Sequence, residues 1–341
     1  MCRNPMFAEQ WIDHFMPRQP KIIGSAKNYT IEMKEQLEKA VAKHGKKLLI
    51  LQCGQCLDCK LQKSREWATR CMLETKEHKN NYFLTLTYDD EHLPHNRKID
   101  IETGEVLNEY VETLYPKDMQ DFWKRLREHY ARKYNITNIR YFECGEYGDK
   151  YQRPHYHAIV FGLPIYDLQP DHKSRRGNMN FKSDEIQKIW GNGIVAIGNV
   201  TWESCAYTAR YVMKKQTGKN KIIYDLQQKY PEFCCMSRRP AIGKTYFEKN
   251  YNKIYQNDEI FTKTKNGVTA VKPCRYFDKL FDVIDHEKMN DIKRNRVEIA
   301  EIRQVQLEKS TDKSWKEVIK DKEESKDLQI QTLKRHFELG Y

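Results

Sequence analysis

The sequence contains no long apolar run and no stretch with the composition of a secretory signal. Its apolar runs, such as Leu48–Leu51 and Ala158–Phe161, are far shorter than the roughly 20 apolar residues that a bilayer-spanning helix needs. Internal repeats and low-complexity tracts are also missing. We therefore expect neither a membrane protein nor a repeat array.

Cysteine is present, but the signals that usually accompany disulfides are not. The chain has 10 cysteines in 341 residues and no secretory signal. Dense disulfides belong mainly to small secreted domains, so both the length and the missing signal favour a reducing compartment. We interpret the cysteines as thiols or metal ligands.

Most of the chain has too little acidic charge to balance its basic residues. The net charge is +12, yet Asp285–Tyr341 contains 13 basic and 13 acidic residues, so the whole excess lies in the first 284 residues. A region of that length can form one large domain or two smaller ones. Its positive charge favours a polyanionic partner, nucleic acid first, although basic charge can also serve solubility alone.

The hydrophobic pattern predicts helices and strands without a steady β-α alternation. We expect residues 1–24 to be irregular and 89–114 to form a long loop or hairpin. Five apolar residues at helical spacing predict a core stripe on the helix that Pro116 opens: Met119, Phe122, Trp123, Leu126 and Tyr130. The other expected helices and strands cover 25–44, 47–51, 60–78, 82–88, 139–147, 155–161, 194–200 and 202–215. This pattern indicates an α+β fold with an antiparallel sheet flanked by helices.

A pair of histidines precedes a buried strand in the stretch RPHYHAIVFG. His155 and His157 are two residues apart, so in a strand their side chains share one face. A catalytic cation needs a further hard ligand, and the preceding strand offers Glu146 and Glu143. Because these glutamates are three apart, only one can face the histidines. We prefer Glu146, and we expect Glu143 to be a surface or DNA-facing carboxylate.

Two tyrosines lie about 50 residues further on, in TWESCAYTARYVMKKQTG. Tyr207 and Tyr211 are four apart on a predicted helix, so they share a face about 6 Å apart along the axis. Lys214 and Lys215 follow one turn later. Neighbouring cations would favour the phenolate and stabilise charge on an attacked phosphate. The alternative is an ordinary aromatic core stripe.

Five motifs together resemble one family. FLTLTY (Phe83–Tyr88), GEYGDKYQRPHYH (Gly145–His157) and YTARYVMKK (Tyr207–Lys215) are similar to the three motifs of HUH endonucleases that initiate rolling-circle replication. CGQCLDCKLQKSREW (Cys53–Trp67) and MSRRPAIGKTYFEK (Met236–Lys249) resemble the replication initiators of gokushovirus-type microviruses, which are small single-stranded DNA phages. The likeness covers about residues 53 to 250.

The resemblance implies an HUH-type fold and a mechanism. His155, His157 and Glu146 would bind Mg²⁺ or Mn²⁺ at the scissile phosphate of a single-stranded origin, also reached in replicative-form DNA. Tyr207 or Tyr211 would attack, leaving a 5′-phosphotyrosyl link and a free 3′-OH, and the second tyrosine would act when the circle is rejoined. Gly243-Lys244-Thr245 lacks the upstream glycine of a P-loop, so the helicase and the polymerase would come from the host, in the bacterial cytoplasm.

With this family in view, the chain divides into four expected parts. They are residues 1–60, an N-terminal segment with a cysteine cluster; 61–218, the endonuclease core; 219–284, a basic C-terminal extension of the core; and 285–341, a charged helical tail. The two alternatives in function are an HUH transposase or plasmid initiator, and a non-catalytic, zinc-stabilised DNA-binding regulator.

The spacing C-x₂-C-x₂-C joins Cys53, Cys56 and Cys59. Chance would give such a pattern in about one of a hundred chains of this composition, so we interpret it as real. Three thiolates need a fourth ligand to complete a structural tetrahedral Zn²⁺ site. The resemblance favours Cys2, with Cys71 and His44 as alternatives. A buried, reduced cluster without metal is the other interpretation.

Basic side chains near the motifs are candidates for phosphate contacts, and aromatic ones for stacking on unpaired bases. Surface charge alone is the competing explanation at each basic position. The basic candidates are Arg153, Arg238, Arg239 and Lys244, and the aromatic candidates are Trp202 and Tyr246.

Overall fold

The computed structural model of the chain forms two compact units. One comprises the described parts of Met1–Lys63 and Asp291–Leu333, and the other comprises those of Ser64–Asn290. The four-part division expected from the sequence stays a prediction. The described residues are 4–11, 20–25, 31–100, 102–148, 151–173, 177, 179–214, 222–264, 267–313, 317–318 and 320–328.

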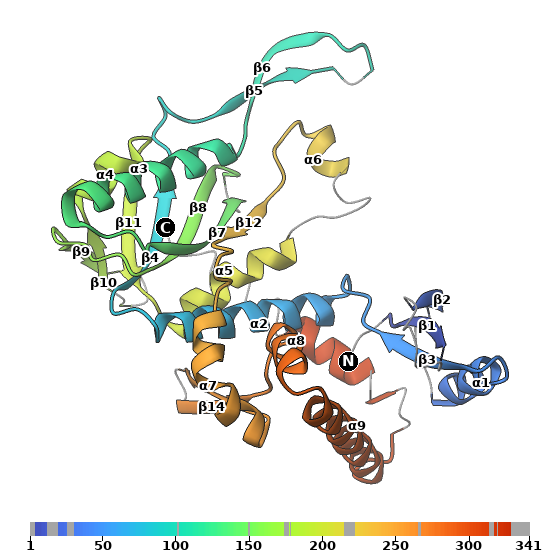
Figure 1. Cartoon of the computed structure of the whole chain (residues 1–341). Helices are drawn as coiled ribbons and strands as arrows, with labels where there is room; N and C mark the ends of the chain where they lie inside the picture. The colour runs from blue at the N-terminus through green and yellow to red at the C-terminus, as the bar shows by residue number, and fades with distance from the viewer. Residues whose placement is uncertain are drawn as a thin grey trace. The chain divides into compact units, whose positions relative to one another are not determined.

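A seven-stranded antiparallel sheet forms the centre of the larger unit (Figure 1). Its strand order is β12-β7-β8-β4-β11-β10-β9, so the strand with the two histidines, β8, lies between β7 and β4. Buried β8 reads as a nearly continuous apolar run, which is expected of a strand covered on both faces. The strands are β4 (Asn81–Thr87), β7 (Arg140–Tyr147), β8 (Pro154–Phe161), β9 (Gln169–Lys173), β10 (Met179–Lys182), β11 (Val195–Asn199) and β12 (Phe233–Met236).

Helices α3 (Pro116–Tyr134) and α4 (Asp184–Trp190) cover one face of this sheet (Figure 1). Pro116 opens α3 where no intrahelical N–H bond is lost, and Asn135 ends it in the left-handed conformation. The predicted stripe is confirmed, since all five of its side chains are buried against the sheet. Ser183 caps α4 by accepting a hydrogen bond from Ile186 N at 3.1 Å.

The other face of the sheet packs against α5 (Trp202–Lys214) and the part of α2 (Leu57–Thr75) that follows Lys63. Ala68 and Cys71 of α2 and Cys205 of α5 share a core cluster with Phe142 and Ile159 of the sheet. The central strands therefore alternate, with successive side chains packed under different helices. This alternation decides which side chains can meet at the histidine pair.

A buried ion pair joins α2 to the first residue of β7. Glu74 Oε1 lies 2.8 Å from Arg140 Nε, and its other oxygen accepts a hydrogen bond from Gly243 N at 2.6 Å. Gly243 has a left-handed backbone (φ 79°), and a Cβ there would lie 3.3 Å from Phe277. The glycine thus serves close packing and offers its N–H to a carboxylate, which agrees with the sequence argument against a P-loop.

The larger unit has two further antiparallel hairpins and three further helices among its described residues. The segment expected as a loop or hairpin contains β5 and β6, which is confirmed as a hairpin. The remaining elements are β5 (His95–Ile99), β6 (Val106–Glu112), α6 (Ile222–Leu226), α7 (Lys244–Asn257), β13 (Ile260–Thr264), β14 (Gly267–Val271) and α8 (Arg275–Ile284).

The smaller unit contains a three-stranded antiparallel sheet of order β2-β1-β3. The expectation that residues 1–24 are irregular is therefore wrong. Prolines at positions 5, 17 and 20 suggested it, but proline is tolerated beside a strand. Helix α9 begins in the larger unit and continues into this one. The elements are β1 (Met6–Trp11), β2 (Lys21–Ser25), α1 (Ile31–Ala42), β3 (Lys46–Leu51) and α9 (His286–Lys309).

Over the described parts of the chain, no helix has both the length and the hydrophobicity needed to cross a membrane.

Candidate metal and nucleophile site

The register of three neighbouring strands places the histidine pair opposite a glutamate. Glu146 of β7 pairs with His155 of β8, and Thr85 of β4 pairs with His157. Residues directly opposite in an antiparallel pair point to the same face, so these four side chains share one side of the sheet. The preference for Glu146 over Glu143 as the neighbour of the histidines follows from this alternation, and the structure has that arrangement.

The three candidate ligands converge on one point. Glu146 Oε1 lies 3.0 Å from His155 Nε2 and 2.7 Å from His157 Nε2. The ligand atoms of these three residues lie within 4.8 Å of one another, which is compatible with a single metal ion. Two imidazoles and one carboxylate form a donor set for a divalent cation.

Helix α5 brings Tyr207 to the same point. The Tyr207 hydroxyl donates a hydrogen bond to Glu146 Oε1 at 3.0 Å and lies 3.4 Å from His157 Nε2. The ring is half-buried and packs edge-on against His157. The aromatic-core interpretation is therefore wrong for Tyr207, whose hydroxyl faces the polar cluster.

Residues that hold the outer sides of the imidazoles complete the site. His155 Nδ1 lies 3.1 Å from the carbonyl oxygen of Arg153, and His157 Nδ1 lies 3.0 Å from Thr85 Oγ1. Phe83 stacks on His157, with ring centroids 5.4 Å apart. Such contacts direct both Nε2 atoms inward, the orientation that metal-bound histidines need.

The electrostatics of Glu146 fit a site for a cation. Burial would raise the pKa of Glu146, but hydrogen bonding to His155 and His157 outweighs it and holds the pKa well below its ordinary value. The carboxylate is therefore ionised at neutral pH, as a metal ligand must be. The arrangement of donor atoms and the charge both suit a divalent ion.

Glu143 has a different environment from the one expected. It is only 3% exposed and faces α3, where Trp123 Nε1 donates a hydrogen bond to its Oε2. Burial raises its pKa to about 7, against the lowering influence of Trp123 and Arg127. The expectation of a surface or DNA-facing carboxylate is therefore wrong, because β7 is covered on both faces.

Sequence reasoning did not identify Thr85, Phe83 or Arg210 as parts of the site. The Arg210 guanidinium carbon lies 5.4 Å from the centroid of the Tyr207 ring. The motif FLTLTY contains Phe83 and Thr85, but only the pairing of β4 with β8 reveals which of its residues meet His157. The three-residue spacing from Tyr207 to Arg210, close to one helical turn, was the available signal for the arginine.

Some candidate residues cannot be located. Tyr211 and Lys214 lie on α5, but their side chains fall outside the description, and Lys215 and Cys2 lie outside the described residues altogether. The roles expected for these four residues stay predictions.

The basic candidates are at least partly accessible. Arg153 donates hydrogen bonds to Asp90 Oδ1 at 2.7 Å and to Tyr88 O at 3.1 Å, while its carbonyl holds His155. Arg238 and Arg239 are exposed just after β12. Lys244 begins α7 and forms a 3.2 Å ion pair with Glu248. Accessibility is compatible with DNA contacts at these positions and does not test them.

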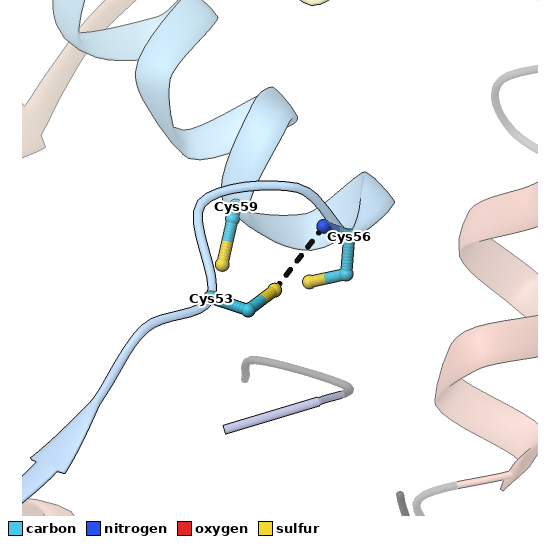
Figure 2. Close-up of side chains that lie close together, drawn as sticks. All are labelled: Cys53, Cys56 and Cys59. Carbon is cyan, nitrogen blue, oxygen red and sulfur yellow. Dashed lines mark hydrogen bonds between the residues drawn. The ribbon is translucent and has the colours of Figure 1, made fainter. Parts of the chain in front are cut away.

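The cysteine cluster lies in the smaller unit, where β3 leads into α2 (Figure 2). The thiols of Cys53, Cys56 and Cys59 lie within 4.8 Å of one another and could hold a metal ion. Cys56 N donates a hydrogen bond to Cys53 Sγ at 3.2 Å, a contact that stabilises negative charge on sulfur. Cys71 instead belongs to an apolar core in the larger unit, where burial raises its thiol pKa well above the ordinary value, so it does not suit a thiolate ligand. His44 does not group with the three thiols.

The fold and the site together define an α+β protein with a candidate metal site beside a tyrosine, and comparison with known proteins adds the family. The family of replication-associated proteins described by the name ORF2 matches residues 81–216, which include Glu146, both histidines and Tyr207. The replication-associated protein ORF2 of Spiroplasma virus 4 is 33% identical over 84% of this chain and 86% of its own. The replication-associated protein VP4 of Bdellovibrio phage phiMH2K is 33% identical over 66% of each chain. No solved structure matches the chain.

The chain therefore belongs to this family of phage replication-associated proteins. The resemblance to phage replication initiators expected from the motifs is confirmed.

Proposed function

We propose that this protein nicks and rejoins DNA to start rolling-circle replication of a small single-stranded DNA phage. One observation carries the proposal: the Tyr207 hydroxyl lies 3.0 Å from Glu146 Oε1 and 3.4 Å from His157 Nε2, inside the candidate metal site. A nucleophile beside a cation site is the arrangement that transesterification of a phosphodiester requires. Neither a transposase nor a non-catalytic regulator is favoured by any of these observations.

In the proposed reaction, Tyr207 attacks the scissile phosphate of a single-stranded origin. Its oxygen forms a bond to phosphorus, the bond from phosphorus to the 3′-oxygen breaks, and that oxygen leaves as a 3′-OH after taking up a proton. A 5′-phosphotyrosyl link remains. Mg²⁺ or Mn²⁺ held by Glu146, His155 and His157 would supply the positive charge that polarises the phosphate and favours the phenolate. Arg210 adds a fixed charge beside the Tyr207 ring.

The second transfer is assigned to Tyr211, four residues further along α5 and about 6 Å along its axis. Tyr211 would cleave the regenerated origin, and the freed 3′-OH would attack the first phosphotyrosyl link to close the circle. Lys214 and Lys215 would stabilise charge on the attacked phosphates. Each step exchanges one phosphodiester bond for another, so joining needs no ATP.

The DNA partners are the single-stranded genome and the replicative form at the origin. Arg153, Arg238, Arg239 and Lys244 are proposed to contact phosphates, in keeping with the excess of positive charge. The host cell would supply the helicase and the polymerase, with the protein acting in the cytoplasm of its bacterial host.

The test is adduct formation on a denaturing gel. Full-length protein is incubated with Mn²⁺ and a labelled single-stranded oligonucleotide that contains the origin of its own genome. We expect a covalent adduct that Tyr207→Phe together with Tyr211→Phe abolishes and that His157→Ala reduces below detection. Tyr224→Phe, on α6, serves as the matched control. An adduct that persists in the double variant would refute the assignment of the nucleophiles.

We also propose that Cys53, Cys56 and Cys59 bind a structural Zn²⁺ ion with Cys2 as the fourth ligand. The register of β1 and β3 pairs Met6 with Leu51, so the chain before β1 approaches from the side on which Cys53 follows β3. Metal analysis of purified protein should give one zinc per chain. We expect Cys53→Ser, Cys59→Ser and Cys2→Ser to lose it, and Cys235→Ser, which changes an exposed cysteine, to keep it. Full zinc content in Cys2→Ser would exclude Cys2 as the ligand.

A further inference from the structure

The buried hydroxyl of Thr85 contacts the outer nitrogen of His157. Thr85 Oγ1 lies 3.0 Å from His157 Nδ1, and the two residues are 4% and 1% exposed. Within the described chain, His157 is the sole hydrogen-bond partner of this hydroxyl. A buried polar group retains a partner because leaving it unpaired is costly, so the contact ties the two side chains together.

The two imidazoles are held in parallel ways from different sources. His155 Nδ1 contacts the main-chain carbonyl of Arg153, and His157 Nδ1 contacts the side chain of Thr85. In both rings, Nε2 then points to Glu146 Oε1. A main-chain carbonyl is present whatever residue occupies position 153, whereas the partner of His157 depends on a hydroxyl at position 85.

We propose that Thr85 is a positioning residue that fixes the ring orientation and tautomer of His157. With Nδ1–H donated to Thr85 Oγ1, the lone pair of Nε2 faces Glu146 and Tyr207, where a cation would be bound. This proposal rests on the proposed function and names a residue on which its metal site depends. Thr85 itself contacts neither DNA nor the metal.

The competing explanation is that threonine at position 85 only suits a buried strand. Threonine and valine have the same shape and similar strand preference, so this explanation predicts that Thr85→Val is harmless. The positioning role predicts the opposite, because valine leaves His157 Nδ1 buried without a partner. Serine keeps the hydroxyl and should restore the function of the wild type.

Thr87 provides a matched control on the same strand. It shares the face of Thr85 and pairs with His155, but its hydroxyl donates to the carbonyl of Ile194 at 3.2 Å. Thr87→Val therefore removes a hydroxyl from the same strand without touching an imidazole nitrogen.

The experiment measures Mn²⁺ affinity of the full chain by electron paramagnetic resonance, with His157→Ala as the background. We expect Thr85→Val to bind Mn²⁺ about 10- to 100-fold more weakly, Thr85→Ser to bind within a few-fold of wild type, and Thr87→Val to be unchanged. Affinity for Mn²⁺ that is equal in Thr85→Val and wild type would overturn the proposal.

A second readout separates this proposal from the proposed function. Nitrogen-15 spectra of the His157 ring, recorded without metal, report its tautomer and its orientation. We expect one ring state in wild type and Thr85→Ser and a mixture in Thr85→Val. If wild type neither binds Mn²⁺ nor cuts DNA, the proposed function fails, and the ring spectra still decide the role of Thr85: identical spectra in all three proteins would overturn it.

Discussion

Strand β7 carries two buried carboxylates that face opposite sides of the central sheet. Glu146 and Glu143 are 2% and 3% exposed, so burial does not distinguish them. Imidazoles surround Glu146 and pull its pKa down, whereas Glu143 has one indole donor and an apolar surround that raises its pKa to about 7. A buried carboxylate is thus a candidate metal ligand only where other ligand atoms converge on it, and Glu143 shows the alternative.

The largest expected effect separates the two carboxylates by activity. We expect Glu146→Gln to lower adduct formation by at least about 100-fold, because the site loses a charged ligand. Glu143→Gln should leave adduct formation within a few-fold of wild type, since its side chain is on the far face. Both are measured as initial rates on the same origin oligonucleotide. Equal losses in the two variants would mean that the faces of the sheet do not differ in function.

A third buried carboxylate, Glu74, extends the comparison to stability. It is as buried as Glu146 and also has a charged partner, Arg140 Nε at 2.8 Å, but it lies outside the candidate site. Glu74→Ala would strand the buried guanidinium, and we expect the free energy of unfolding to fall by about 3–5 kcal/mol. Urea denaturation measures the change.

The matched control for Glu74 is Lys249→Ala, which breaks a more exposed ion pair with Glu77, three residues further along the chain from Glu74. We expect it to cost less than about 1 kcal/mol. A similar cost for Glu74→Ala would show that the Glu74–Arg140 pair contributes no more than a surface pair.

Glu143 should make the protein less stable as the pH rises. Its pKa in the folded chain, about 7, lies above the ordinary value of 4.5, so the folded state binds the proton more tightly than the unfolded state. The stabilisation is complete below pH 4.5 and is lost as the pH rises through about 7, a change of about 3 kcal/mol. Glu143→Gln should remove this part of the pH dependence in urea titrations at about pH 5 and about pH 8. An unchanged difference between those two conditions would contradict the raised pKa.

Much of the candidate site follows from the sequence because strand periodicity is a simple rule. His155 and His157 share a face, and Glu146 can be preferred because the two glutamates are three residues apart and must face opposite ways. The helix with Tyr207 is expected at 202–215 and is found at Trp202–Lys214. Local spacing is enough for each of these inferences.

The remaining features depend on contacts between distant segments. The partner of His157, Thr85, is 72 residues away along the chain, and only the pairing of β4 with β8 joins them. The environment of Glu143 depends in the same way on α3 covering β7. The strands before residue 25 were missed because their partner, β3, follows them by about 20 residues or more, and short strands flanked by prolines carry a weak local signal.

The smallest expected effect concerns the single donor on the far face. The indole N–H of Trp123 donates to Glu143, and this bond is stronger when the carboxylate is ionised. Trp123→Phe loses packing at every pH, but it loses the charge-assisted bond only where Glu143 is ionised. We therefore expect its cost in unfolding free energy to be about 1 kcal/mol larger at about pH 8 than at about pH 5. In the Glu143→Gln background the cost should be the same at both pH values, because no charge remains on the acceptor. A pH-dependent cost that persists in that background would assign the effect to another group, and the contrast between Glu143 and Glu146 would then need a different cause.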